Sequence, residues 1–457
     1  MQAPEHKGKE IPKVPGHWLL GSLVDFKRAP HEFLASAAQF GEGLVQFRLL
    51  HKKMIAITSP SVAQHLFKTN SQNYPRGNQR KALESVLGLG LITQEGKLWK
   101  HHRRVVAQAF RSDFLQYSLN QNSRLVSSLL DSWAEKADSG EFVDVVEETR
   151  KMTLAVIVRA LFSVDLDLES NQELYSAIVD ANHLMFTRHT SPLSFPDWIP
   201  TPLNRKLAHT RHVMDAFIDQ RLADKEAVAG EGTEDIADHF LQAENEGELG
   251  RQQIYDEIRT LLVAGFETTA TSLAWTIYLL AKHPEVTESW RQELDGVLGD
   301  RAPVWEDMGS LPKTEQIVME GLRLYPPAYG LTRTSLEDEV VEGYHLPAAA
   351  SLVLSIYGIQ RSGLYWQDPE QFRPDRFAED WPEEAFLPFG MGKHICIGSR
   401  FSILESTLIL ACIGQRFEFE LAEDRIVAPR AQVTLLPEQS ILLRLRNRQN
   451  VASNRHP

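Results

Sequence analysis

The sequence predicts a mainly α-helical protein with a small β-rich part. Helical patterns run through most of the chain, and the longest spans residues 254–282. It stops at His283-Pro284, because proline cannot continue a helix. Strand-like stretches are few and short, at residues 44–47, 54–57, 352–356 and 441–445. With 43% hydrophobic and 24% charged residues, the chain can bury a sizeable core and is not disordered.

The N-terminal part begins with a polar, proline-containing segment. Residues 1–16 hold no secretory core and no apolar run of about 18 residues that could span a bilayer, so we expect no membrane anchor. The first two strand-like stretches flank the turn Leu50-His51-Lys52-Lys53 and form a candidate hairpin. Ser59-Pro60 then opens a helix through Phe67, since proline suits the first helical turn. Residues 74–91 are predicted to form a loop.

Charge and cysteine content exclude some classes of protein. The net charge of -13 argues against a general nucleic-acid binder, because nothing would offset repulsion from phosphate. Cys396 and Cys412 are the two cysteines of the sequence, too few for a disulfide framework. This cysteine usage fits a reducing compartment, and we expect a cytoplasmic protein.

The middle of the chain is predicted to be largely helical. A basic helical pattern covers residues 96–110, where Trp99 and Arg103 share one face because they are four residues apart. Such a pair is commonly a surface stacking pair. Further helical patterns span residues 124–136, 147–162, 171–189 and 203–224. The proline-rich stretch 191–202 is predicted to be a loop, and residues 227–234 a polar linker.

The long helical segment has an unusual centre, Ala264-Gly265-Phe266-Glu267-Thr268-Thr269. One small, partly polar face of this helix comprises Leu261, Ala264, Gly265, Thr268 and Ser272. A mid-helix glycine costs about 1 kcal/mol relative to alanine, which points to a reason other than helix stability. Thr268 can bond back to the Ala264 carbonyl and open a groove along the helix. A packing notch against another helix is the alternative explanation.

Two further segments carry charges in apolar surroundings. Glu320 and Arg323 are three residues apart, a spacing that usually gives a solvated pair worth about 0.2–0.5 kcal/mol. Their neighbours Ile317, Val318, Met319, Leu322 and Leu324 are apolar, so we expect this pair to be buried. A later segment, Phe372-Arg373-Pro374-Asp375-Arg376-Phe377, also places charged residues between two phenylalanines. Breaking such a buried ionic group costs about 3–5 kcal/mol.

A glycine-punctuated loop with one cysteine precedes the helical sequence Phe401 to Arg416. Its glycines, Gly390, Gly392 and Gly398, allow the backbone to turn with positive φ and to approach a flat partner. Amides at the start of the next helix favour a thiolate at Cys396. An isolated cysteine is otherwise more often a small buried hydrophobe.

The residues around this cysteine resemble the haem-binding signature of the cytochromes P450, Phe-x-x-Gly-x-(Arg/His)-x-Cys-x-Gly. The matching residues are Phe389, Gly392, His394, Cys396 and Gly398, with Glu405 following. Five P450-like motifs occur in the family's order between Trp99 and Glu405. The resemblance implies the cytochrome P450 fold, mainly α with a small β-rich lobe, as a single domain over residues 1–457 with tails at 1–16 and 447–457. It also implies haem b with Cys396 as the iron ligand, in a soluble bacterial type of P450.

The same resemblance implies roles for other residues. Thr268 is the proton-delivering hydroxyl and Glu267 the adjacent acid, next to Ala264 and Gly265 at the cofactor. The expected contacts of the haem propionates are Trp99, Arg103, Arg333 and His394, although an exposed arginine is the alternative for Arg333. Glu320, Arg323 and Arg376 form a structural triad. The substrate-lining residues are Leu87, Leu89, Leu184, Phe186, Leu261, Ala328, Leu331 and Leu435.

The predicted function is that of a haem-thiolate monooxygenase that inserts one oxygen atom of O2 into an apolar substrate. The chain stops at Pro457 without a flavin or ferredoxin module, so we expect electrons from a separate ferredoxin or flavodoxin-type donor with its reductase. The lining favours terpenoids, including carotenoids, slightly over fatty acids, for which Arg188 is a candidate carboxylate anchor. A peroxide-dependent P450, a P450-type dehydratase or isomerase, and a non-enzymatic haem sensor or electron carrier are the alternatives.

Overall fold

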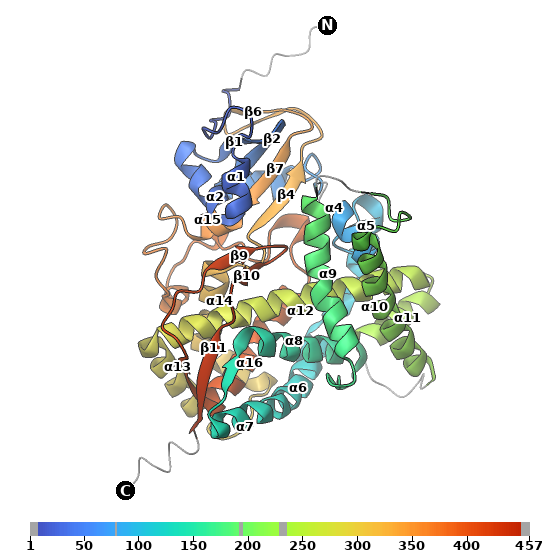
Figure 1. Cartoon of the computed structure of the whole chain (residues 1–457), viewed down its shortest axis with the longest axis vertical. Helices are drawn as coiled ribbons and strands as arrows, with labels where there is room; N and C mark the ends of the chain where they lie inside the picture. The colour runs from blue at the N-terminus through green and yellow to red at the C-terminus, as the bar shows by residue number, and fades with distance from the viewer. Residues whose placement is uncertain (1–7, 78–79, 192–194, 228–234, 449–457) are drawn as a thin grey trace. The chain divides into compact units, whose positions relative to one another are not determined.

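The computed structural model describes residues 8–77, 80–191, 195–227 and 235–448. The chain forms two compact units, one from Met1–Arg80 and Leu322–Cys396, the other from Lys81–Gly321 and Ile397–Pro457. We call them the sheet unit and the helical unit. As the sequence predicts, the structure is mainly helical with small sheets (Figure 1).

The sheet unit is built on four strands in the order β1-β2-β7-β4. These are β1 (Leu44–Leu49), β2 (Lys52–Ile57), β7 (Ser351–Ser355) and β4 (Gly330–Thr334). The predicted hairpin is confirmed, because β1 and β2 pair antiparallel with Leu49 opposite Lys52. β2 pairs parallel with β7, and β4 pairs antiparallel with β7. A second hairpin joins β5 (Glu339–Val341) to β6 (Tyr344–Leu346).

Short helices complete the sheet unit. They are α1 (Leu23–Arg28), α2 (Pro30–Ala37), α3 (Pro60–Gln64) and α15 (Ile356–Gln360). The start of α3 is as predicted, since Pro60 occupies its first turn and the Ser59 hydroxyl accepts a hydrogen bond from the Val62 amide at 3.3 Å. The next five residues, His65–Thr69, form a π-helix labelled η2. A π-turn of this kind is rare and often occurs near functional sites.

The helical unit is organised around α12 (Arg251–Lys282), which packs against α8 (Val145–Phe162). The other long helices are α5 (Gly96–Gln108), α6 (Ser112–Leu129), α7 (Asp131–Ser139), α9 (Gln172–Thr190), α10 (Pro202–Ala227), α11 (Ile236–Asn245), α13 (Pro284–Val297) and α16 (Ser399–Arg416). Small sheets add β3 (Phe142–Asp144), β11 (Leu442–Asn447) and β8 (Phe417–Leu421), with a separate pair of β9 (Pro429–Ala431) and β10 (Leu435–Pro437). Among the described residues, no helix is both long enough and apolar enough to cross a bilayer.

Two predictions of local structure are wrong. The helix predicted over 124–136 is divided, because α6 ends at Leu129 and α7 begins at Asp131. The stretch 74–91, predicted to be a loop, contains the helix α4 (Arg80–Leu87). Of the proline-rich segment 191–202, residues 192–194 lie outside the described residues, as do residues 228–234 of the predicted linker.

Candidate functional site

Of the five residues predicted to form a small face on α12, Ala264, Gly265 and Thr268 are partly accessible, whereas Leu261 and Ser272 are buried. From Asp256 to Leu280 every residue is buried except Ala264, Gly265 and Thr268, which are half-buried. Ala264 and Gly265 lie four and three residues before Thr268, so all three lie on the same side of the helix. Between Asp256 and Leu280 this helix thus leaves one narrow strip accessible, with room for a flat ligand to lie against it.

The hydrogen bond predicted within this strip is present. Thr268 Oγ1 donates to the Ala264 carbonyl oxygen at 2.7 Å, as predicted, while α12 stays helical throughout. The hydroxyl oxygen therefore keeps acceptor capacity for a further partner. Gly265 also provides the packing notch considered as an alternative, since a Cβ there would lie 3.2 Å from Ile157 Cδ1 of α8. Its absent side chain allows the two helices to approach closely.

Glu267 lies beside this strip but turns into the protein. Its side chain is 3% exposed, and Oε1 accepts a hydrogen bond from Arg150 Nη2 of α8 at 2.8 Å. Burial disfavours the charge on Arg150, but the attraction and the hydrogen bond of Glu267 outweigh it and raise the pKa of the guanidinium. Glu267 Oε2 is buried without a hydrogen-bond partner among the described residues. Sequence reasoning missed Arg150, which is 117 residues away and gives no local signal.

The cysteine loop belongs to the sheet unit as far as Cys396, whereas Gly398 belongs to the helical unit. Gly390 and Gly392 have φ values of +69° and +71°, as expected, whereas Gly398 has a φ of -90°. At Gly392 a side chain is impossible, because a Cβ would overlap the carbonyl oxygen of Phe67 in η2. The Cys396 amide donates to the Phe389 carbonyl oxygen at 3.0 Å, which closes the loop. The cysteine is exposed in the structure, and α16 begins three residues later at Ser399.

The four expected propionate contacts are divided between the units. Trp99, which is buried, and Arg103 lie on α5 of the helical unit, so Trp99 is not part of an exposed surface pair. Arg333 on β4 and His394 lie in the sheet unit. Arg333 is buried rather than exposed, with its guanidinium 4.2 Å from the centre of the Phe67 ring and Nη1 donating to the Thr332 carbonyl oxygen at 2.8 Å.

The predicted triad residues are all buried. Glu320 and Arg323, on α14 (Pro312–Leu324), have no exposed surface, and Arg376, on the 3₁₀ segment η4 (Pro374–Ala378), is 6% exposed. Arg323 donates to the carbonyl oxygens of Gln360, Pro369 and Gln371 at 2.8, 2.7 and 3.1 Å. The expectation of a buried charged group is therefore confirmed, and backbone carbonyls supply part of its partners.

Three of the predicted substrate-lining residues belong to one apolar cluster. Leu87, Leu184 and Leu261 are all buried in the main core of the helical unit. Leu435 is also buried, whereas Phe186, Ala328 and Leu331 are half-buried and Leu89 is 48% exposed. The possible carboxylate anchor is already engaged, because Arg188 forms an ion pair with Asp197.

Two adjacent carboxylates of α12, which the sequence did not reveal, hold the loop that carries Leu89. The Leu89 amide donates to Asp256 Oδ2 at 2.8 Å, and the Leu91 amide donates to Glu257 Oε2 at 3.1 Å. Glu257 Oε1 also lies 2.7 Å from Nδ1 of His102, and both side chains are fully buried. Burial raises the pKa of Glu257. The three-residue spacing of His102 from Trp99 was the one signal that could have placed this histidine on the buried face of α5.

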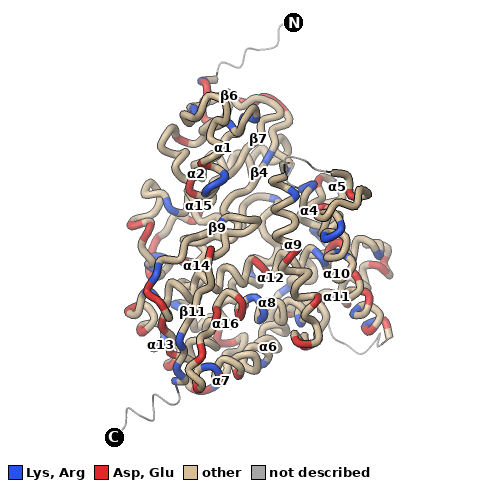
Figure 2. The backbone as a smooth tube through the Cα atoms, viewed as in Figure 1, with Lys and Arg blue, Asp and Glu red and all other residues tan. Residues whose placement is uncertain are grey.

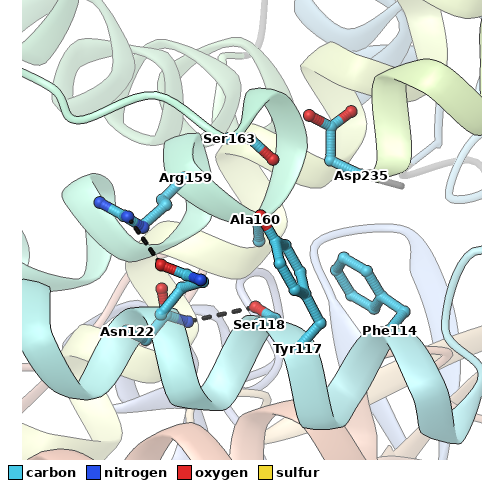
Figure 3. Close-up of a pocket in the computed structure, with 9 residues that line it drawn as sticks. Phe114, Tyr117, Ser118, Asn122, Arg159, Ala160, Ser163 and Asp235 are labelled. Atoms are coloured by element: carbon cyan, nitrogen blue, oxygen red, sulfur yellow. Dashed lines mark hydrogen bonds between the residues drawn. The ribbon is translucent and has the colours of Figure 1, made fainter. Parts of the chain in front are cut away.

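A hollow in the helical unit lies apart from these residues (Figure 3). Its lining includes Phe114, Ser118 and Asn122 of α6, with Arg159 of α8. Asn122 donates to the Ser118 hydroxyl at 3.3 Å. No predicted site residue is among those that line it.

Comparison with known proteins decides the family. The family Cytochrome P450 matches residues 12–445. The chain belongs to the cytochrome P450 family. One similar protein is Cyclooctatin synthase of Streptomyces melanosporofaciens, 30% identical over 91% of this chain and 91% of that protein. Another is Protein LUTEIN DEFICIENT 5, chloroplastic, of Arabidopsis thaliana, 29% identical over 83% of this chain and 68% of that protein. Cyclooctat-9-en-7-ol 5-monooxygenase of the same Streptomyces is 29% identical over 87% of both chains.

Family membership makes this P450 an oxidoreductase of the monooxygenase type, with haem-thiolate iron as its cofactor. The residues of this chain fit such a group. A cysteine is exposed on a loop whose glycines adopt positive φ. The strip on α12 carries no bulky side chain, since it consists of Ala264, Gly265 and Thr268. The predicted propionate contacts, Trp99, Arg103, Arg333 and His394, are residue types that can donate hydrogen bonds, which suits carboxylates such as propionates.

Proposed function

We propose that this P450 inserts one oxygen atom of O2 into a C–H or C=C bond of a largely hydrocarbon substrate, with terpenoids, including carotenoids, ahead of fatty acids. The observation that carries the proposal is the half-buried strip of Ala264, Gly265 and Thr268 on an otherwise buried helix. The ion pair of Arg188 with Asp197 disfavours a fatty-acid carboxylate anchor there. Among the similar proteins, those named for cyclooctatin support a terpenoid substrate.

Cys396 is the proposed ligand of the iron, and haem b is the proposed form of the cofactor. A covalent c-type attachment would need a Cys-x-x-Cys-His sequence, which the chain does not contain. The haem supplies the oxygen chemistry when bound, with the anionic sulfur donating electron density to the iron. Trp99, Arg103, Arg333 and His394 are the proposed partners of its propionates.

Thr268 and Glu267 are the proposed proton-handling residues. Thr268 Oγ1 is held on the Ala264 carbonyl oxygen, and its free acceptor site can take a hydrogen bond from water. Glu267 keeps one oxygen, Oε2, for a water molecule, while Arg150 stabilises the charge through Oε1. In this proposal Glu267 Oε2 takes up a proton from water and releases it through water to Thr268 Oγ1, so that the carboxylate is ionised again after each transfer. Gly265 and Ala264 keep bulky side chains out of the strip.

We further propose a single functional domain over residues 1–457, in the cytoplasm, that receives electrons from a separate acidic ferredoxin or flavodoxin-type protein. The exposed residues Lys97, Lys100 and Arg104 on α5 support this donor, because they form a basic surface on a chain of net charge -13. Electron-transfer rates should fall with added salt. A rate that is independent of salt, and unchanged in the Lys97→Ala/Lys100→Ala variant, would contradict the docking surface.

A spectral titration with a library of apolar compounds tests the substrate class. Terpenoids and carotenoids should displace water and shift the spin state, and NADPH with surrogate reductases should then give oxygenated product. Turnover that needs peroxide and ignores the reductases would instead favour a peroxide-dependent P450. A rearranged or dehydrated product without added oxygen would favour an isomerase or dehydratase. Full spin conversion by a small, highly polar compound, and none by any lipid-like compound, would refute the proposed substrate.

A further inference from the structure

Several large apolar side chains of the sheet unit project into solvent from neighbouring turns. Trp18 is 80% exposed, Leu19 53% and Leu50 42%, and Val24 on α1 is 63% exposed. Trp18 and Leu19 lie in a turn closed by hydrogen bonds between His17 and Gly21. Leu50 lies at the tip of the β1–β2 hairpin, and its amide donates to the Leu20 carbonyl oxygen at 3.0 Å. The four side chains therefore come from adjoining backbone segments.

One arginine fixes the backbone beneath these side chains. Arg48 Nη1 donates to the carbonyl oxygens of Leu19 and Leu50 at 3.0 and 2.5 Å. Its Nη2 donates to those of His17 and Trp18 at 2.9 and 2.7 Å. Leu50 is held at a φ of +55°, which a leucine adopts only when its surroundings impose it. The turn is thus pre-ordered, and a partner would not pay the entropy of ordering it.

Basic residues flank the apolar group. Lys52 and Lys53 follow the Leu50 tip, and Lys27 and Arg28 end α1, where they lie three and four residues from Val24 on the same face. All four are exposed. Figure 2 shows Lys and Arg in blue beside α1. Asp25 is the acidic residue of α1 and lies 3.8 Å from Arg28. This local excess of positive charge contrasts with the net charge of -13 of the whole chain.

We propose that the surface of Trp18, Leu19, Val24 and Leu50, with its basic flank, adsorbs on an anionic lipid bilayer. Tryptophan and leucine enter the boundary between headgroups and acyl chains, and tryptophan favours this region because its ring is amphipathic. Lysine and arginine next to them are attracted to anionic headgroups. Adsorption of this kind needs no membrane-spanning helix. It would hold the enzyme where an apolar substrate dissolves.

Co-sedimentation of the purified haem-loaded enzyme with vesicles tests this. The wild-type enzyme should bind anionic vesicles of phosphatidylcholine with phosphatidylglycerol more strongly than neutral vesicles of phosphatidylcholine alone, and binding to the anionic vesicles should weaken as salt is added. The Trp18→Ser/Leu19→Ser variant should lower the vesicle partition coefficient about tenfold or more. The Lys52→Gln/Lys53→Gln variant should weaken binding to anionic vesicles and reduce the salt dependence.

Leu364→Ser is the matched control. Leu364 is 78% exposed and lies in the sheet unit, outside the proposed lipid-binding surface. The Leu364→Ser variant therefore removes an exposed leucine without changing that surface, and it should bind vesicles as the wild type does. An unchanged carbon monoxide difference spectrum would verify that each variant is folded. The proposal is overturned if the wild-type enzyme binds neither vesicle type, if it binds neutral and anionic vesicles equally, or if Leu364→Ser weakens binding as much as the Trp18 variant.

Discussion

Replacing Glu339 by glutamine should loosen the segment that supports the cysteine loop. The Glu339 carboxylate accepts hydrogen bonds from His65 at 2.6 Å, from Asn70 at 3.0 Å and from the Tyr74 hydroxyl. His65 is the first residue of η2, and Asn70 and Tyr74 follow it; the Phe67 carbonyl of η2 packs against Gly392. Hydrogen bonds to a charged group contribute about 1.5–3 kcal/mol each, and glutamine retains one acceptor oxygen, so we expect a loss of about 2–3 kcal/mol.

Hydrogen exchange of the backbone amides measures this loss locally, without requiring two-state unfolding of the whole chain. Amides in residues 65–77 should exchange about 30- to 150-fold faster in Glu339→Gln, because about 1.4 kcal/mol corresponds to a factor of ten. Glu337→Gln is the control, since it makes the same change of charge two residues away on an exposed side chain. Equal exchange in the two variants would refute the supporting role of Glu339.

The effect should also depend on pH. Burial alone would raise the pKa of Glu339, but the hydrogen bonds from Tyr74, His65 and Asn70 outweigh it and hold the pKa below its usual value. A carboxyl whose pKa is lowered by folding stabilises the folded state above the pKa of the unfolded chain. That stability is lost as pH falls through the folded-state pKa. The difference between wild type and Glu339→Gln should therefore be full at neutral pH and shrink in acid, and a difference that grew in acid would contradict this.

Three further variants test the site. Cys396→His should abolish the thiolate-type spectrum of the reduced carbon monoxide complex, and retention of that spectrum would refute Cys396 as the iron ligand. Thr268→Val should leave haem content and substrate affinity nearly unchanged while product formed per NADPH falls, since losing one proton-transfer step typically costs ~10²–10⁴ in rate. Unchanged coupling would mean that protons reach the site by another route. Gly88→Ala should speed amide exchange around residues 88–91, because Gly88 has a φ of +72° and a Cβ would overlap the Asp256 carboxylate. Gly250→Ala is the control and should not speed amide exchange, because its Cβ would lie 3.6 Å from the nearest atom. Equal effects of Gly88→Ala and Gly250→Ala would contradict the close packing of Gly88 against Asp256.

The long central helix could be predicted because its signals are local. The proline at the start of α13 ends α12 at Lys282, as expected, and the bond from Thr268 to Ala264 connects residues one helical turn apart. The break between α6 and α7 falls at Leu130, where neither glycine nor proline marks it. A helix boundary of this kind depends on tertiary packing, which local patterns do not encode.

Contacts between residues distant in sequence could not be predicted. The glycines in the Gly88-Leu89-Gly90 stretch suggested a loop, but they are required because Asp256 and Thr260 of α12 approach their backbone closely. The partner of Glu339 in η2, His65, is 274 residues away. In both cases the neighbouring residues in the sequence give no sign of the contact. The role of Asp256 and of Glu339 in the fold depends on a distant partner that only the three-dimensional structure identifies.

The parallel pairing of β2 with β7 has a consequence for biosynthesis. Ile57 of β2 pairs with Leu354 of β7, and roughly 300 residues separate the two in the sequence. After Ile57 has been synthesised, its partner therefore follows only about 15–60 s later, at ~5–20 residues per second. Until then the free edge of β2 offers unpaired backbone groups to other nascent chains. The residues of the cysteine loop emerge later still, after β7. In the proposed role of Cys396 as iron ligand, capture of the cofactor is therefore a late event. Slow translation before residue 351 would expose the hairpin to aggregation for longer.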